Sequence, residues 1–396
     1  MDKPTLIIWG AGKIGRGPIA DMFHTAGWHL IFVRRSDEYI RKMRETGRYT
    51  IMRCEPETDP RPVTIAGFEA YSTSEIESLV DAIKRADLII VPVMSPQIAA
   101  TARHIAAALT HRREERPLDV LNILPCANMV NSSAAFRDAL EKATPSAAQE
   151  YLTAKIGVAE SLIRIGAADP PDTPPGDDPG RVFVRYPGTY EVDVDAFKGP
   201  RPDIPGLTWV HDPVSASMRK IWVANMSHAY IAYRGWLCGH TRIHQCATDP
   251  LVIGEGNRAV SEATAALIAD SRMTEEQACE AMQFFSRRAA SSNYPDTIQR
   301  VGSDPRRKLG RNDRFIGPLL LARSHGLPFK ALSRGVACAL RYDNPADSSA
   351  MWIQRRIAER GVAATITEVC ELQADEADVA DAIAAAYEEL GTTSGG

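Results

Sequence analysis

The sequence predicts an α/β protein with a doubly wound parallel sheet in its N-terminal domain and only helices in its C-terminal domain. Three observations predict this. Strand-like and helix-like segments alternate in the first half of the chain, which favours a parallel sheet covered on both faces. A glycine-rich turn follows the first strand-like run, and beyond Pro213 amphipathic patterns recur with little strand signal. With 396 residues there is room for two or three domains, which we place at residues 1–200 and 201–396.

Four short apolar runs predict the strands of the parallel sheet: Thr5–Trp9, His29–Val33, Asp87–Val93 and Asp119–Leu124. Helix-period segments lie between them, for example at about Gly15–Ala26 and at Ile98–Leu109. Proline, glycine and aspartate dominate residues 169–180, which we expect to be a surface loop. The alternating segment Arg181–Val194 predicts one or two strands at the edge of the sheet.

Six amphipathic patterns predict the helices of the C-terminal domain: Ser215–Cys238, Gly254–Ser271, Thr274–Ala290, Ile316–His325, Ser349–Glu359 and Asp375–Leu390.

The composition excludes several classes of protein. Lys plus Arg (46) against Asp plus Glu (50) gives a net charge of −4, so no basic field argues for nucleic acid. The longest apolar runs are short of the roughly 18 residues of a membrane span, and we find no export signal. The seven cysteines are scattered without a CxxC. We therefore expect a cytoplasmic protein with reduced thiols.

The glycine turn has the pattern G-x-G-x-x-G at Gly10, Gly12 and Gly15, with Lys13 and Ile14 in between. After a strand and before a helix, this pattern is typical of a dinucleotide-binding Rossmann-type domain, because the backbone can approach a pyrophosphate and the helix N-terminus offers free N–H groups. A glycine-rich turn without a ligand is the alternative.

The residues after the second strand indicate which dinucleotide binds. A site for NAD usually has an acidic residue about 20 positions after the glycines, but here the strand ends in Arg34, Arg35 and Ser36. Two guanidinium groups and a hydroxyl suit a 2′-phosphate. We therefore predict a preference for NADP(H), with NAD(H) as the alternative.

A second set of candidate residues lies in the first helix of the C-terminal domain. At about 100° per residue, Lys220, Asn225 and His228 lie at about 0°, 140° and 80° and share one side of an α-helix. A partly desolvated lysine can act as a general base, and an amide and an imidazole can hold a reacting oxygen. A solvated lysine beside hydrogen-bonded Asn and His side chains is the structural alternative.

Three further motifs are weaker. Asn128 follows a predicted strand, where an amide could donate to the same oxygen. A basic cluster offers Arg306, Lys308 and Arg311 to a substrate phosphate, although a solvated loop or a cofactor contact fits equally well. The segment Cys238–Cys246 contains two histidines, but its spacing is not a standard zinc spacing. We expect no metal there, and a continuation of the preceding helix.

With these residues the chain resembles the polyol-specific long-chain dehydrogenases of the mannitol dehydrogenase family, most closely their mannitol-1-phosphate 5-dehydrogenase branch. The resemblance covers most of the chain and rests on GAGKIGRG at 10–17, Cys-x-Asn-Met-Val at 126–130, EVDVDAFKG at 191–199, K-x4-N-x2-H and A-Y-x-G within 220–235, and DPRRKLGRNDRFIGP at 304–318. It implies a Rossmann-type domain and a helical domain with a metal-independent active site between them. It implies Lys220 as the general base, Asn128 and Asn225 as donors that polarise the substrate oxygen, and His228 as the group that orients it.

The chain also departs from the family pattern. Ala127 stands where the family usually has an acidic residue, and Leu162-Ile163-Arg164 stands where it has Val-Asp-Arg. Arg34 replaces the usual acidic residue after the second strand, and Met94-Ser95-Pro96 replaces the usual Gly-Pro near the nicotinamide. These departures imply a shift to NADP(H), fewer acidic groups near the reacting carbons, and a phosphorylated polyol, sugar or cyclitol other than mannitol 1-phosphate.

We therefore expect an NAD(P)-dependent oxidoreductase that interconverts a secondary alcohol and a ketone on a polyol or sugar phosphate. We expect a monomer or homodimer with a small-molecule, phosphorylated substrate and with neither nucleic acid nor membrane as a partner. An enzyme acting on an unphosphorylated polyol, cyclitol or keto-uronate is one alternative. A non-catalytic protein that senses a dinucleotide is the alternative of another class.

Overall fold

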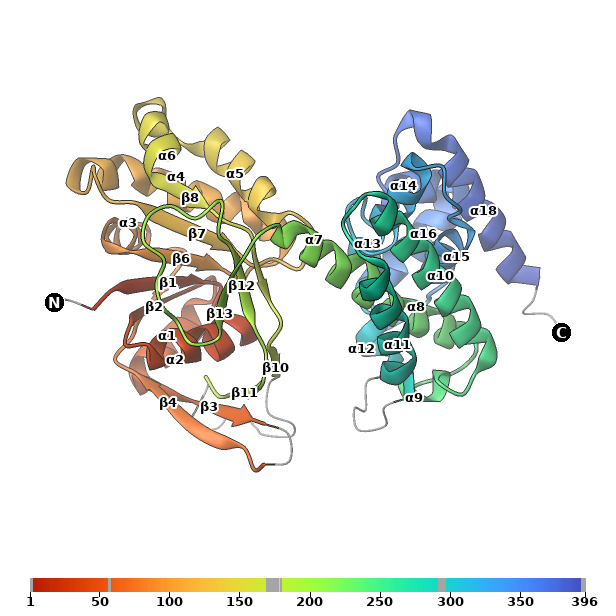
Figure 1. Ribbon diagram of the computed structural model, residues 1–396, viewed down its shortest axis with the longest axis horizontal. Helices are drawn as coiled ribbons and strands as arrows, with labels where there is room; N and C mark the ends of the chain where they lie inside the picture. The colour runs from red at the N-terminus through yellow and green to blue at the C-terminus, as the bar shows by residue number, and fades with distance from the viewer. Residues whose placement is uncertain (1–2, 56–57, 169–177, 179, 291–296, 393–396) are drawn as a thin grey trace. The chain divides into compact units, whose positions relative to one another are not determined.

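The structure is a computed structural model that describes residues 3–55, 58–168, 178, 180–290 and 297–392 (Figure 1). The chain divides into two compact units, Met1–Val214 and Ser215–Gly396. The domain boundary that we expect between residues 200 and 201 stays a prediction. Most of the loop expected at 169–180 lies outside the described residues.

The N-terminal unit contains a six-stranded parallel sheet with the strand order β5-β2-β1-β6-β7-β8. Its strands are β1 (Thr5–Trp9), β2 (His29–Arg34), β5 (Glu69–Ser72), β6 (Leu88–Val91), β7 (Leu121–Pro125) and β8 (Ile156–Val158). The order reverses between β1 and β6, which makes the sheet doubly wound and places a ligand crevice at the carboxyl ends of these two strands. The predicted fold class and all four predicted strands are confirmed.

Helices cover both faces of this sheet (Figure 1). One face carries α1 (Ala20–Thr25) and α2 (Asp37–Thr46), and the other carries α3 (Ile76–Arg85), α4 (Ile98–Glu115), α5 (Ser132–Ala143) and α6 (Gln149–Lys155). Successive side chains of a strand point to opposite faces. Leu6 and Ile8 of β1 accordingly pack into one apolar core, whereas Ile7 and Trp9 pack into the other.

Two smaller sheets complete the unit, with the orders β10-β11-β3-β4 and β13-β12-β9. Their strands are β3 (Arg48–Cys54), β4 (Arg61–Ala66), β9 (Ser161–Ile163), β10 (Gly166–Ala168), β11 (Val182–Arg185), β12 (Tyr190–Asp193) and β13 (Leu207–Val210). The prediction that Arg181–Val194 forms strands was right, but their placement at the edge of the parallel sheet was wrong. β11 lies between β10 and β3, and β12 lies between β9 and β13. Strands with alternating apolar and polar residues bury only one face, and this pattern suits these mixed sheets better than the parallel sheet, which is covered on both faces.

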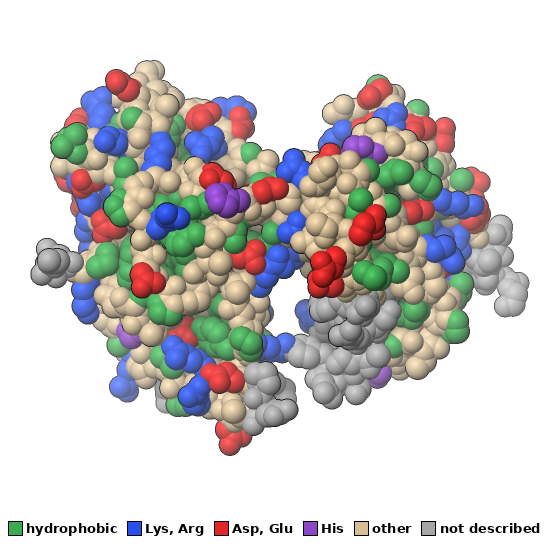
Figure 2. Space-filling model, in the orientation of Figure 1, with side chains coloured by type: hydrophobic (Ala, Val, Ile, Leu, Met, Phe, Trp, Pro, Cys, Tyr) green, Lys and Arg blue, Asp and Glu red, His purple; other side chains and the backbone are tan. Residues whose placement is uncertain are grey.

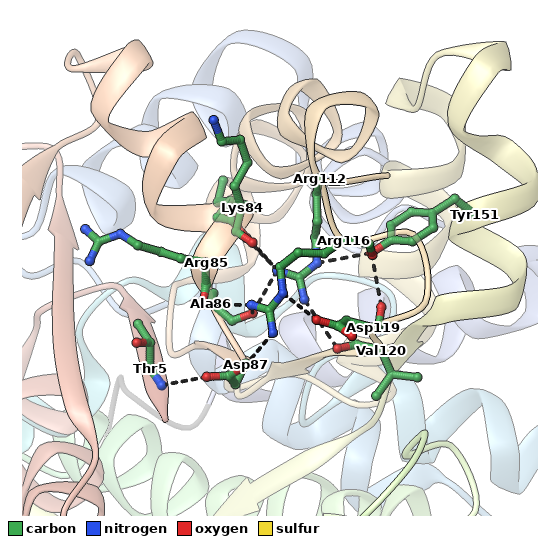
Figure 3. A network of polar contacts seen from close by, with 11 residues as sticks. Thr5, Lys84, Arg85, Ala86, Asp87, Arg112, Arg116, Asp119, Val120 and Tyr151 are labelled. Atoms are coloured by element: carbon green, nitrogen blue, oxygen red, sulfur yellow. Dashed lines mark hydrogen bonds and ion pairs between the residues drawn. The ribbon is translucent and has the colours of Figure 1, made fainter. Parts of the chain in front are cut away.

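A buried arginine closes the end of the sheet opposite to the crevice (Figure 3). The fully buried Arg112 of α4 donates to the carbonyls of Ile83, Lys84 and Ala86 at 2.8–2.9 Å, and its Nε lies 3.2 Å from the Tyr151 hydroxyl. These carbonyls belong to the C-terminal end of α3, which carries unpaired acceptors and a partial negative charge. The charge of Arg112 is thus compensated mainly by peptide groups.

The C-terminal unit is helical, and its described residues add only the isolated bridge between Arg242 and Thr297. Its α-helices are α7 (Pro213–Met218, which begins in the first unit), α8 (Met226–Leu237), α9 (Ile243–Cys246), α10 (Pro250–Ala269), α11 (Glu275–Ala290), α12 (Ile298–Gly302), α13 (Pro305–Lys308), α14 (Ile316–Ser324), α15 (Lys330–Leu340), α16 (Ser348–Arg360), α17 (Val362–Val369) and α18 (Ala377–Thr392). Inside it, the buried Glu255 accepts from Arg234 at 2.8 Å and from Arg334 at 2.9 Å. All six predicted helical regions are confirmed.

Acidic and basic side chains are intermingled on the face of each unit that Figure 2 shows. Among the residues that the structure describes, no helix combines the length and the hydropathy of a membrane span.

Candidate functional site

The glycine turn joins β1 to a π-helical turn, η1 (Gly15–Ile19), that continues into α1. Gly10 has a φ of +127°, and a Cβ atom there would lie 2.9 Å from the Pro92 carbonyl oxygen. A Cβ atom on Gly15 would collide with the Gly10 carbonyl oxygen and lie 2.9 Å from Ile8 Cγ2. The fold itself therefore requires the first and the third glycine of the motif.

Gly12 differs from the other two glycines, because a Cβ atom there would meet nothing within 4 Å. Gly12 and Lys13 are exposed and Ile14 is half-buried. The turn thus leaves open space over its backbone at the entrance to a helix, where N–H groups and the helix dipole favour an anion. This geometry fits the pyrophosphate of a dinucleotide.

Arg34 lies at the end of β2, beside the glycine turn. Its Nη1 donates to the Ala11 carbonyl oxygen at 3.1 Å, and its guanidinium lies 3.9 Å from the centroid of the Tyr39 ring. Arg35 and Ser36 are exposed, and Ser36 Oγ accepts from the Tyr39 N–H at 3.3 Å and caps α2. The three predicted residues therefore lie together at the carboxyl end of the second strand.

The nearest acidic residue after this strand is already engaged. The Asp37 carboxylate accepts hydrogen bonds from the hydroxyls of Ser72 and Ser74. These bonds hold the pKa of Asp37 below its usual range. The cationic side chains thus stand nearer than Asp37 to the end of the strand.

Asn128 lies in the loop between β7 and α5. The Cys126 N–H donates to the Val91 carbonyl oxygen at 3.0 Å, which fixes the start of this loop against the end of β6. Asn128 is exposed, Cys126 is half-buried and Ala127 is buried. Because β1, β6 and β7 are parallel, Asn128 and the glycine turn lie at the same edge of the sheet.

The segment that carries the candidate base is not the regular α-helix that we expected. Residues Arg219–Asn225 form a π-helical segment, η4, and the Met226 N–H reaches back five residues to the Ile221 carbonyl. The predicted separation of about 140° between Lys220 and Asn225 is therefore wrong. A π-helical turn holds more residues than the 3.6 of an α-helical turn, so residues five apart lie closer in angle than in an α-helix, and such turns are frequent at functional sites.

Buried and half-buried residues alternate along η4 and the start of α8. Lys220, Asn225 and His228 are half-buried, whereas Trp222 and Met226 are buried. The buried face is anchored within the unit, where Trp222 Nε1 donates to the Asn312 carbonyl oxygen at 3.2 Å. All three candidate residues are thus partly accessible, in contrast to their buried neighbours Trp222 and Met226.

The structure gives each residue of the basic cluster a different partner. Arg306 is exposed, and its guanidinium lies 4.1 Å from the Trp352 ring centroid. Lys308 is buried, and its Nζ donates to the carbonyls of Val301 (2.6 Å) and Ser303. Arg311 forms a bidentate pair with Glu376, with both N···O distances at 2.7 Å. Their role toward a substrate stays a prediction.

The histidine-rich segment after α8 has another structure than predicted. The helix does not continue, because α8 ends at Leu237, Gly239 has a φ of +79° and α9 begins only at Ile243. His240 pairs with Asp249 at 2.9 Å. No group of three or more side chains that could hold a metal ion occurs among the residues that the structure describes.

Sequence reasoning missed one buried acid near the Asn128 loop. Glu160 is 1% exposed and follows β8 in the run Ile156–Ile163, which is apolar apart from Glu160 and Ser161. A carboxylate in such a run is the signal that could have found it, since buried charges need specific partners.

Comparison with known proteins identifies the family. The model of the mannitol dehydrogenase Rossmann domain matches residues 4–204, and that of the mannitol dehydrogenase C-terminal domain matches residues 215–391. The chain belongs to the mannitol dehydrogenase family. The resemblance seen in the sequence is thereby confirmed.

Among curated relatives in this family, the mannitol-1-phosphate 5-dehydrogenase of Bacillus licheniformis is 31% identical over 369 residues, which cover 93% of this chain and 95% of the relative. Two solved structures share the fold. The mannitol 2-dehydrogenase of Pseudomonas fluorescens, in a ternary complex with NAD and D-mannitol, has a TM-score of 0.75 at 16% identity and covers 99% of this chain and 93% of its own. A D-sorbitol dehydrogenase has a TM-score of 0.70 at 14% identity, with 99% and 94% covered.

Proposed function

We propose that this protein is an NAD(P)-dependent, metal-independent dehydrogenase that interconverts a secondary alcohol and a ketone on a polyol or sugar phosphate. One observation carries the proposal: Lys220, Asn225 and His228 lie close together along a π-helical segment and the helix after it, and all three are partly accessible. Membership of the mannitol dehydrogenase family and the open glycine turn at Gly12 support it.

The residues of the chain divide the reaction between them. In the oxidation direction, Lys220 as a neutral amine accepts the proton of the substrate hydroxyl while the carbon loses a hydride. Asn128 and Asn225 donate to the substrate oxygen, and His228 binds and orients it. The nicotinamide, when bound, supplies the hydride chemistry. Reduction runs through the same groups, with Lys220 returning the proton.

We assign the cofactor preference to Arg34, Arg35 and Ser36, with NADP(H) preferred over NAD(H). The position of Arg34 beside Ala11 and over Tyr39 supports this assignment, because a guanidinium there can bind a 2′-phosphate with charge-assisted hydrogen bonds. The pyrophosphate is assigned to the turn of Gly10, Gly12, Lys13, Ile14 and Gly15.

For the substrate we propose a phosphorylated polyol, with Arg306, Lys308 and Arg311 near its phosphate. The curated relative acts, by its name, on mannitol 1-phosphate. A second candidate is an unphosphorylated polyol, cyclitol or keto-uronate. The bidentate pair of Arg311 with Glu376 and the burial of Lys308 favour this second candidate, because both cations already have partners. A cytoplasmic location and a monomeric or dimeric state stay predictions.

Lys220→Ala tests the proposal. We expect turnover to fall by roughly 10²–10⁴-fold, the usual worth of a general base, while NADPH still binds. Turnover is followed by NADPH and NADH absorbance across sugar phosphates, free ketoses and cyclitol ketones, and binding by titration. Lys330→Ala, at an exposed lysine at the start of α15, is the matched control. Unchanged turnover in Lys220→Ala would refute the base assignment, and cofactor binding without turnover of any substrate would favour the dinucleotide sensor.

A further inference from the structure

Two consecutive buried residues contact both ends of the loop that carries Asn128. The loop runs from Cys126 to Asn131, between the end of β7 at Pro125 and the start of α5 at Ser132. Ser161 Oγ donates to the Pro125 carbonyl oxygen at 2.8 Å, at the beginning of the loop. The Glu160 carboxylate accepts from the groups at its end.

The contacts of Glu160 provide the N-terminal cap of α5. Its Oε2 accepts from the Ser133 N–H at 2.6 Å, and its Oε1 accepts from Ser132 Oγ at 3.0 Å. Asn131 occupies the capping position with a φ of +55° but makes no capping hydrogen bond with its side chain. The free N–H groups at a helix start need such an acceptor, so a residue distant in sequence supplies what Asn131 does not.

The two contacting residues are themselves held firmly. Glu160 is 1% exposed and its carbonyl oxygen accepts from the Asp193 N–H at 3.0 Å. The Tyr190 hydroxyl donates to Ser161 Oγ at 3.1 Å. β9 and β12, to which Ser161 and Tyr190 belong, are paired strands, so a strand pair outside the parallel sheet supports both ends of the loop.

The cap of α5 needs an acceptor, and here that acceptor is a buried carboxylate. Burial raises the pKa of Glu160, so an ionised carboxylate is costly there and a fully apolar core would avoid that cost. A carboxylate has two acceptor oxygens, so it fixes both Ser132 Oγ and the Ser133 N–H in direction as well as in distance. Such precision matters for the loop 126–131 if Asn128 contacts the substrate oxygen, since a misplacement of about 1 Å can lower the rate on the order of 10²-fold.

We propose that Glu160, together with Ser161, is a positioning residue that holds the loop 126–131 so that Asn128 meets the substrate oxygen. The catalytic part of this inference rests on the proposed function, in which Asn128 donates to that oxygen. Glu160 itself touches neither substrate nor cofactor in this role.

The test compares Glu160→Ala and Glu160→Gln with a matched control, Glu262→Ala. Glu262 also accepts from two helix N–H groups, those of Ala331 (3.0 Å) and Leu332 (2.9 Å) at the start of α15, and burial raises its pKa too. We expect Glu160→Ala to lower kcat by on the order of 10–10²-fold with little change in cofactor affinity. Glu160→Gln keeps an acceptor for the Ser133 N–H and should restore most of the activity. Glu262→Ala should lower Tm without a comparable loss of kcat.

A double variant separates positioning from general destabilisation. If Glu160 acts through Asn128, then Asn128→Ala with Glu160→Ala is no slower than Asn128→Ala alone, because coupled residues are non-additive. Multiplied effects in the double variant, or full activity of Glu160→Ala, overturn the proposal.

Hydrogen exchange supplies a readout that does not depend on turnover. Glu160→Ala should speed amide exchange in residues 126–133, whereas Glu262→Ala should not, and unchanged exchange there overturns the proposal. Wild-type turnover in Asn128→Ala, or a wild-type protein inactive on every polyol, counts against the proposed function instead. The exchange result still decides whether Glu160 holds the loop.

Discussion

Arg34 is the residue to which we assign the cofactor preference, and its guanidinium contacts the glycine turn at Ala11 and the ring of Tyr39. For Arg34→Asp we expect NADPH affinity to fall about 10–100-fold, since hydrogen bonds to charged groups contribute roughly 1.5–3 kcal/mol. NADH affinity should hold or improve, because a carboxylate can accept from the ribose 2′-hydroxyl. Titration of both cofactors measures this.

The control for that substitution is Arg41→Ala in α2, where an exposed arginine pairs with Glu45 four residues later. It should leave both affinities unchanged. An equal loss of NADPH and NADH in Arg34→Asp would mean that Arg34 serves only to hold the Ala11 turn.

Lys308 gives a prediction about pH. Burial, and then the charges of Arg314 and Arg307, lowers the pKa of Lys308 to about 7 from the ordinary 10.5. Between these two pH values the unfolded chain binds the proton and the folded chain does not, so this group makes the free energy of unfolding rise with pH. The slope reaches up to about 1.4 kcal/mol per pH unit, and it vanishes below pH about 7, where both states are protonated.

Urea unfolding of the wild type and of Lys308→Met from pH 6 to about 10 checks this effect. The difference between the two proteins should be flat at low pH and then grow in favour of the wild type. Lys330→Met, at an exposed lysine, controls for the loss of a charge. A difference that stays constant over the whole range would contradict the burial of an amine that loses its proton near neutrality.

At the scale of elements, two helical glycines should respond to alanine with opposite signs. A Cβ atom on Gly317 of α14 would lie 2.5 Å from Trp222 Cε2 and Nε1, whereas one on Gly254 of α10 would meet nothing within 4 Å. We expect Gly317→Ala to destabilise the protein by about 1–3 kcal/mol through overpacking. Gly254→Ala should stabilise it by about 0.5–1 kcal/mol through helix propensity. Thermal or urea unfolding of both variants measures the difference, and equal stability would contradict the close contact between α14 and Trp222.

The elements also show what a local pattern can and cannot predict. The strand Thr5–Trp9 was predicted to the residue, because an apolar run that ends at a glycine leaves little choice. Helix α15 was missed, since nine of its eleven residues are buried and no polar face marks its period. The sheet of β3 and β4 was missed as well, because charged residues such as Arg53 and Arg61 interrupt its alternation.

The candidate site divides in the same way. The glycines and Arg34 were found because their spacing along the chain reports directly on the turn. The π-helical geometry at Lys220 was not, since a rotation of about 100° per residue assumes i→i+4 bonding throughout. Glu160 escaped because its partners lie 27 and 28 positions away, and a contact of that range depends on the packing of β8 beside α5.

For the whole molecule, the proposed function gives the two compact units different tasks, apart from Asn128 in the first unit. The N-terminal unit holds every residue assigned to the dinucleotide, and the C-terminal unit holds Lys220, Asn225 and His228. Substitutions at Arg34 should therefore affect which nucleotide binds, whereas those at Lys220 should affect the chemical step, as should those at Asn128 in the first unit. Family membership follows from both halves of the chain, because each matches its own domain model.

The empty surroundings of Gly12 have a consequence for how this lineage can change. The fold requires Gly10 and Gly15, so both would persist even in a descendant that no longer binds a nucleotide. Gly12 is not required by the fold, because a methyl group there would contact no other part of the protein. It would collide only with a phosphate bound over the turn. Retention of glycine at position 12 among descendants of this gene would therefore indicate selection for nucleotide binding, whereas its loss would indicate that this selection has ended.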